Sequence, residues 1–195
     1  MSVALKHEKF TYRDYMQLPD EPRVELIRGD FLMCAAPNLQ HQRSSGTLFV
    51  HLWEWVQNRL LGEVFSAPTD VVLSNENVVQ PDILFVSAEK MKTVGELNIQ
   101  VAPDLVVEIL SPSHEGRDRI LKKSVYEEFG VSEYWVVDPK RQTVTVMVRE
   151  KKKLQTKKVY SHKQTVKSTL LEGFEIPLAR LFTSAKRPKH SKRLL

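Results

Sequence analysis

The sequence lacks most of the features that mark specialised classes of protein. Cys34 is the only cysteine among 195 residues, which excludes a disulfide scaffold and any zinc or iron–sulfur site built from several cysteines. No run of about 18 apolar residues occurs, so we expect no transmembrane helix. The first ten residues show neither a long apolar stretch nor a small-residue cleavage site. We therefore expect no signal peptide and a cytoplasmic protein.

Four common enzyme motifs are also missing. GxxxxGK(S/T), GxGxxG, GxSxG and HExxH do not occur in the sequence. P-loop nucleotide hydrolases, dinucleotide-dependent enzymes, α/β-hydrolases and zincin proteases therefore have no support.

The positive charge of the chain is concentrated near its C-terminus. The net charge is +5, but residues 149–195 carry 14 basic and 3 acidic residues, and residues 1–148 carry 15 basic and 21 acidic ones. Basic residues in 149–158 and 186–193 predict weak contacts with nucleic-acid phosphates, and the alternative is a solvated surface or tail. The lysines concerned in the first segment are Lys151, Lys152, Lys153, Lys157 and Lys158.

Composition and periodicity predict one globular domain. Hydrophobic residues make up 42% and charged residues 27% of the chain, which is ordinary for a folded protein. We expect a single domain over residues 1–182 and a flexible basic tail over 183–195. Helices are expected over 11–18, 40–61, 116–129 and 176–182, and strands over 63–73, 78–86, 104–110, 133–138, 142–149 and within 153–171, after a hairpin turning at Gly29–Asp30. This order predicts an α/β (α+β) fold in which one mixed sheet has helices on its faces.

Two acidic residues stand inside apolar strands. Asp82 occurs in VVQPDILFV and Glu108 in PDLVVEIL. A carboxylate among such neighbours is costly unless a metal ion or a buried cation compensates it. Two carboxylates from neighbouring strands can hold one Mg²⁺. The alternatives are a turn-forming Asp82 after Pro81 and a Glu108 in a buried ion pair, for instance with Lys122.

A lysine on the helix expected over 116–129 can reach such a site. Asp118, Lys122 and Tyr126 are spaced by four residues and form a row beside the apolar stripe that includes Ile120. Lys122 is therefore the candidate for contacting the sheet, whereas Lys123 projects toward solvent. The alternative for Lys122 is a cation on the helix surface.

The ordered set of segments resembles a known family. It consists of VELIRGDFLMCAAP, HQRSSGTLFVHL, VVQPDILFV, APDLVVEILSPS, RDRILKKSVYEEFGVSEYWVVDP and TVTVMV. Together they resemble the Uma-type restriction-endonuclease family, within the PD-(D/E)XK nuclease superfamily. The resemblance implies a restriction-endonuclease-like fold and Mg²⁺- or Mn²⁺-dependent hydrolysis of DNA.

The resemblance assigns roles to individual residues. It implies that Asp82 and Glu108 bind the metal and that Glu25 is an additional acid of the site; the alternative for Glu25 is an edge-strand residue facing water. The superfamily's lysine usually follows the second acid by two residues, where this chain has Leu110. In relatives of this type the lysine has moved to the following helix, which matches Lys122.

The remaining implications concern two polar residues and the partners. His41 and Gln80 match polar positions typical of the family; His41 projects onto the core side of its helix, where a packed histidine is the alternative to a substrate contact. Homodimerisation is an expectation from the superfamily. Two other functions stay open: a catalytically inactive DNA-binding or accessory protein, and a metal-dependent phosphodiesterase acting on a small nucleotide.

Overall fold

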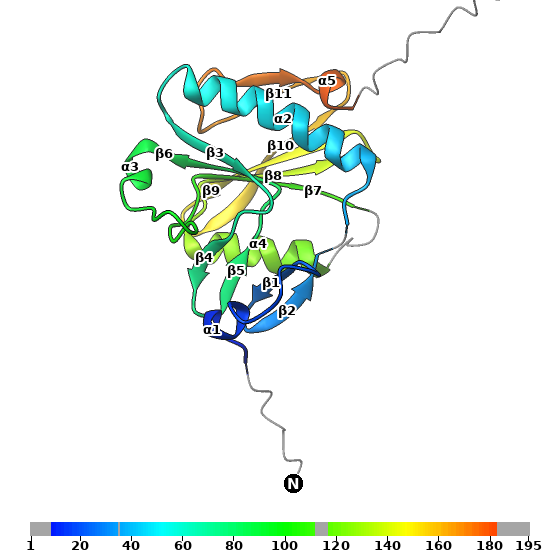
Figure 1. The fold of residues 1–195 in the computed structure, drawn as a ribbon. Coiled ribbons are helices and arrows are strands. Elements are labelled where there is room, and N and C mark those ends of the chain that lie inside the picture. Colours follow the sequence, from blue (N-terminus) through cyan, green and yellow to red (C-terminus); the bar gives the residue numbers. More distant parts are fainter. Residues whose placement is uncertain (1–8, 35, 112–116, 183–195) are drawn as a thin grey trace, which may run out of the picture.

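A mixed sheet with helices on both faces forms the centre of the molecule (Figure 1). The structure is a computed structural model that describes residues 9–34, 36–111 and 117–182. The sheet has six strands in the order β10-β9-β8-β7-β6-β3. Their bounds are β3 (Gly62–Ser66), β6 (Ile83–Ser87), β7 (Leu105–Ile109), β8 (Glu133–Asp138), β9 (Thr143–Glu150) and β10 (Lys153–Ser161).

Strands β7 and β8 are parallel, and the other neighbours in this sheet are antiparallel. A parallel pair needs a crossover, which helix α4 (Arg117–Phe129) provides between β7 and β8. This connection matters for function because it lays α4 across one face of the sheet, directly after the strand that carries Glu108.

A second, smaller sheet packs below α4 in Figure 1. Its four antiparallel strands run in the order β2-β1-β5-β4. The expectation of one sheet was therefore wrong in this detail, because two pairs of strands leave the central sheet. The bounds are β1 (Val24–Ile27), β2 (Asp30–Met33), β4 (Val71–Ser74) and β5 (Asn77–Val79), and a two-stranded sheet contains β11 (Thr165–Lys167) and β12 (Glu175–Pro177).

The helices cover opposite faces of the central sheet. Helix α2 (Leu39–Gln57) and the short α5 (Leu178–Phe182) lie on one face, and α4 lies on the other (Figure 1). Side chains alternate along β7, so Leu105, Val107 and Ile109 join the core under α2 while Val106 joins the core under α4. The remaining helices are α1 (Tyr12–Tyr15) and α3 (Ala88–Met91).

Proline explains two differences from the expected elements. The strand expected over 63–73 is two strands, β3 and β4, which belong to different sheets and are separated at Pro68; the strand expected over 78–86 is likewise β5 and β6, separated at Pro81. Proline has no N–H to continue a strand ladder. The second break leaves Gln80 and Asp82 outside the regular ladder.

Other boundaries shift by a few residues. The hairpin turns at Arg28–Gly29, whose φ angles are 54° and 79°, the left-handed pair that a two-residue hairpin turn requires. Helix α2 ends at Gln57 rather than near 61, because Leu60 adopts a φ of 53°. Ile120 is 66% exposed, so it is not part of the apolar stripe of α4, where it was expected. The helix is rotated so that Lys122 and Tyr126, and not Ile120, face the sheet.

No helix among the described residues is long and apolar enough to cross a membrane. The tail expected over 183–195 and the side chain of Asp118 lie outside the described residues. The single domain over 1–182 stays a prediction.

Candidate active site

Asp82 lies where the ladder of the central sheet ends. Its main-chain oxygen accepts from Ala67 N at 3.1 Å. Its Oδ2 accepts from Ile109 N of β7 at 2.7 Å and lies 3.1 Å from His41 Nε2 of α2. The carboxylate is therefore fixed by one strand and one helix, at the edge where β6 and β7 begin to pair.

Glu108 is the register neighbour of Asp82. Strands β6 and β7 pair Ile83 with Val107, so the next antiparallel step brings Asp82 opposite Glu108. The side chain of Glu108 points toward α4. Its Oε1 accepts from Lys122 Nζ at 3.0 Å and from Tyr126 OH at 2.6 Å.

Lys122 joins Glu108 to a third carboxylate, Glu25. Nζ of Lys122 lies 2.8 Å from Glu25 Oε1, and the same oxygen accepts from Gln80 N at 2.6 Å. Glu25 does not face water from an edge strand: β1 lies between β2 and β5, and Glu25 is 5% exposed. The pairing of β1 with β5 brings this acid to the segment that precedes Asp82.

The surroundings shift the pKa values of three groups. Burial raises the pKa of Glu108 to about 7, with the Asp82 and Glu25 carboxylates adding to the rise and Lys122 opposing it. Burial opposes the charge of Lys122, but Glu108 and Glu25 outweigh it and raise the lysine pKa well above 10.5. Burial, then Glu108, raises the pKa of Tyr126. Lys122 is therefore a permanent cation at neutral pH, and Tyr126 a hydrogen-bond donor.

His41 lies in the first turn of α2 and reaches Asp82 from the opposite side. The helix begins there because the Asn38 side chain caps it, accepting from Gln40 N and His41 N. A carboxylate is an acceptor, so His41 donates from Nε2 to Asp82. Its buried Nδ1 has no hydrogen-bond partner in the described structure. The core-side placement expected for His41 is met, and the ring also contacts the acid that was expected to bind metal.

Sequence reasoning missed Arg23. Its Nε and Nη2 donate to Gln80 Oε1 at 3.1 and 2.9 Å. Arg23 precedes Glu25 by two residues, and residues so spaced in extended chain share a face. That spacing was the available signal, because the residue two positions before an acid of the site lies on the same face of the chain as that acid.

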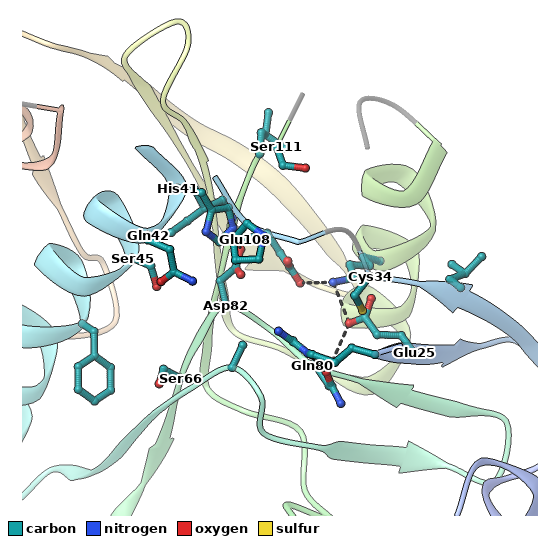
Figure 2. A pocket seen from close by; sticks show the side chains of 18 of the residues that line it. Glu25, Cys34, His41, Gln42, Ser45, Ser66, Gln80, Asp82, Glu108 and Ser111 are labelled. Atoms are coloured by element: carbon teal, nitrogen blue, oxygen red, sulfur yellow. Dashed lines mark hydrogen bonds and ion pairs between the residues drawn. The ribbon is translucent and has the colours of Figure 1, made fainter. Parts of the chain in front are cut away.

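These side chains surround one pocket of about 300 Å³. Figure 2 shows His41, Asp82 and Glu108 on one side of it and Glu25 and Gln80 on the other. Residues far apart in sequence thus meet at one place. The lining also includes Arg23, Cys34, Gln42, Ser45, Lys122 and Tyr134.

Two carboxylate oxygens suit a divalent cation. Asp82 Oδ1 and Glu108 Oε2 accept no hydrogen bond from the described residues. Mg²⁺ commonly takes one or two protein carboxylates and completes its shell with water and phosphate oxygens. The described residues contain no group of three or more His, Cys, Asp or Glu side chains arranged to hold a metal. The donor set therefore fits a two-carboxylate Mg²⁺ or Mn²⁺ site, and not a closed cage.

The five lysines expected to contact nucleic acid do not line this pocket. They are exposed, in the β9–β10 turn and on β10, the edge strand of the central sheet. One of them, Lys153, binds Glu127 of α4 at 3.1 Å. The segment 186–193 lies outside the described residues.

Comparisons with known proteins agree with this architecture. The sequence model of the Uma2 family, described as "Putative restriction endonuclease", matches residues 12–179. No curated protein matches the chain. A solved structure, of a "putative nuclease belonging to DUF820" from Anabaena variabilis ATCC 29413, is similar at 21% identity and a TM-score of 0.77. The match covers 89% of this chain and 97% of that one, which confirms the predicted mixed α/β fold with flanking helices.

Proposed function

The chain belongs to the Uma2 family, and we propose that it is a metal-dependent endonuclease that hydrolyses phosphodiester bonds in DNA. The reaction adds water across one phosphorus–oxygen ester bond. The hydroxyl goes to phosphorus, and the departing sugar oxygen receives the proton.

Asp82 and Glu108 would hold the divalent cation, Mg²⁺ or Mn²⁺, through Oδ1 and Oε2, which accept no hydrogen bond from the described residues. When bound, such an ion polarises a phosphate oxygen and lowers the pKa of a bound water. Glu25 is the candidate for a second ion or for a water in its shell. The hydrogen bonds from Ile109 N and His41 to Asp82 hold that carboxylate in one orientation.

Lys122 acts as a cation and not as a base. Its raised pKa keeps it protonated, so Nζ can only donate. In the pocket it would orient the attacking water or stabilise negative charge that develops on the phosphate. Tyr126, on the next turn of the same helix, donates to the same oxygen of Glu108 as Lys122 does and helps to hold the carboxylate in place.

One observation carries the proposal: Asp82, directly before β6, and Glu108, opposite it on β7, line a single pocket with an ion-paired lysine. A pair of buried acids is costly, and one lysine already contacts two acids. A divalent cation would compensate the negative charge of the acids that this lysine does not balance. The exposed lysines of the β9–β10 hairpin would then contact backbone phosphates without reading sequence.

The test is cleavage of plasmid, linear and branched DNA by purified protein in Mg²⁺ or Mn²⁺. We expect Asp82→Asn and Glu108→Gln to lose cleavage by at least about 100-fold, since each removes a charge that holds the cation. Glu63→Gln is the matched control, because Glu63 is exposed on β3 and does not line the pocket. Equal cleavage by the wild type and both site variants would identify a contaminating nuclease and reject the proposal.

The ion pairs of Lys122 favour a second candidate, a nuclease-like protein that binds DNA without cutting it. Leu110 occupies the position where the superfamily usually has its lysine. Lys122 is engaged by Glu25 and Glu108, so the buried-ion-pair alternative for Glu108 is also present in the structure. A calorimetric Mn²⁺ titration separates the two functions: no metal binding, with DNA binding that survives Asp82→Asn, would support the second.

The size and charge of the pocket make a small phosphodiester a further substrate to test. Its volume of about 300 Å³ lies at the lower end of the range for small-ligand sites, and three carboxylates line it. Activity on a chromogenic diester with none on DNA would select this alternative. Gel filtration beside these assays tests the predicted homodimer.

A further inference from the structure

Arg23 is a cation of the pocket that contacts no carboxylate among the described residues. Within the described residues, its guanidinium donates hydrogen bonds only to the amide oxygen of Gln80, from Nε at 3.1 Å and from Nη2 at 2.9 Å. Lys122, by contrast, contacts Glu25 and Glu108 directly. Within the described residues, the charge of Arg23 is thus not paired with an acid and can be offered to a ligand.

Gln80 holds the guanidinium in place with a neutral acceptor. The amide is itself fixed, because Gln80 Nε2 donates to Asp70 Oδ1 at 2.8 Å and to Tyr15 OH at 3.1 Å, and its main-chain N donates to Glu25. A carboxylate in the place of this amide would neutralise Arg23. Gln80 instead orients the fork, and no carboxylate of the described residues forms an ion pair with it.

The charges of the pocket are consistent with an anionic occupant. Glu25, Asp82 and Glu108 face two cations, Lys122 and Arg23, which leaves one negative charge when all three acids are ionised. A divalent cation on Asp82 and Glu108 changes this to one positive charge. A phosphodiester, with a single negative charge, restores neutrality.

Arg23 also lies at a junction between cavities. Arg23 and Gln80 line both the pocket and a neighbouring cavity of about 780 Å³. Arg23 therefore borders both cavities, and a phosphate at its guanidinium lies next to space for the rest of a nucleic-acid chain. Guanidinium nitrogens match phosphate oxygens in spacing and charge.

We propose that Arg23 is a substrate-binding residue that donates from its guanidinium to a non-bridging oxygen of the phosphodiester, with Gln80 as its positioning residue. The proposal rests on the proposed function, because the phosphate it addresses is the one at the candidate metal site.

The kinetic test uses bis(4-nitrophenyl) phosphate in Mg²⁺ or Mn²⁺. We expect Arg23→Gln to raise KM at least about tenfold with kcat changed by less than about threefold, as for loss of a charge-assisted contact made in ground and transition states alike. Arg23→Lys retains the charge without the fork and should recover part of the loss. Gln80→Glu should raise KM as well, because the new carboxylate neutralises Arg23.

Arg59→Gln is the matched control for the loss of one arginine charge. Arg59 lies beyond the C-terminal end of α2, where it stacks on Trp55, whereas His41 is in the first turn of this helix; at 1.5 Å per residue the two ends are about 25 Å apart. Mn²⁺ affinity and thermal midpoint should be unchanged in Arg23→Lys. An unaltered KM in both Arg23 variants would overturn the proposal while the proposed function stands.

A binding measurement makes the proposal independent of turnover. Dimethyl phosphate is titrated into ¹⁵N-labelled protein with Mg²⁺, and the Nε–H signal of Arg23, assigned by its loss in Arg23→Lys, is followed. A saturable shift of this signal supports the proposal, even if the wild type hydrolyses no diester and the proposed function fails. The proposal is overturned if other signals of the wild type shift and saturate with dimethyl phosphate while the Arg23 Nε–H signal does not. It is also overturned if no signal from the pocket shifts at all.

Discussion

Lys122 is the counter-charge of two buried carboxylates, and its replacement by methionine tests how much stability depends on that charge. Its Nζ lies 2.8 Å from Glu25 Oε1 and 3.0 Å from Glu108 Oε1, and the three side chains are 14%, 6% and 13% exposed. Removing one partner of a buried pair costs about 3–5 kcal/mol, because the other charge stays buried and unpaired.

Protonation of Glu108 relieves part of this cost. Burial already raises its pKa to about 7, and Lys122→Met removes the charge that opposes the rise. At pH 7 the variant can therefore neutralise Glu108 by taking up a proton. We expect its free energy of unfolding to fall by about 2–3 kcal/mol, which lowers Tm by roughly 4–12 °C for a protein of this size.

The loss of stability should grow with pH. A carboxyl whose pKa is raised by folding contributes stability that is present below its unfolded pKa and lost as pH rises through the folded value. In Lys122→Met that loss extends to higher pH, whereas the wild-type lysine, with its raised pKa, stays charged and compensates Glu108. The difference between the two proteins should thus be smallest near pH 5 and approach about 3–5 kcal/mol near pH 9.

The assay is urea denaturation at pH 5, 7 and 9 in EDTA, followed by tryptophan fluorescence. Lys163→Met, at an exposed loop position, is the control for loss of one positive charge. Adding Glu108→Gln to Lys122→Met should recover most of the deficit at pH 9. A variant as stable as the wild type, or a deficit that does not change between pH 5 and 9, would refute the reasoning.

Three further predictions concern stability and use the same denaturation measurement. Glu127→Gln should cost about 2 kcal/mol, because Glu127 accepts from Leu154 N and from two lysines, whereas Glu128→Gln loses only a surface pair with Arg28 and should cost under about 1 kcal/mol. Gly62→Ala should cost about 3 kcal/mol, since its φ is 146° and a Cβ would lie 2.1 Å from Val86 O; Gly46→Ala in α2, with open space around it, should instead stabilise by about 1 kcal/mol. Tyr126→Phe should cost about 2 kcal/mol through the lost hydrogen bond to Glu108, and an unchanged midpoint would show that this bond contributes nothing.

Much of the fold followed from periodicity, and the two strands that it predicted wrongly share one physical cause. The helices α2 and α4 and strands β7, β8 and β9 were predicted within a few residues, because each has a regular pattern of apolar residues. The segments 63–73 and 78–86 were each predicted as one strand. Each is split between two sheets at a proline, and local alternation carries no information about which neighbour a strand pairs with.

Part of the candidate site was likewise predicted from the sequence, and part of it was not. Asp82 and Glu108 stood out because a carboxylate within an apolar strand is anomalous, and Lys122 because four-residue spacing set a polar row beside an apolar stripe. Glu25 entered through the family resemblance, and its neighbour Arg23 was missed. Arg23 directly precedes β1 and Glu25 lies in it. The place of β1 beside Gln80 depends on its pairing with β5, a contact across about 50 residues of sequence.

The sequence by itself determined the class of fold and the family, and it predicted the acids that would hold a cation, because these depend on local pattern and on residue type. Only the tertiary structure decided which groups meet. It brought Lys122 between Glu25 and Glu108, His41 onto Asp82, and Arg23 onto a neutral amide. Those contacts join four separate elements, and their charges and pKa values follow from distances that no single segment specifies.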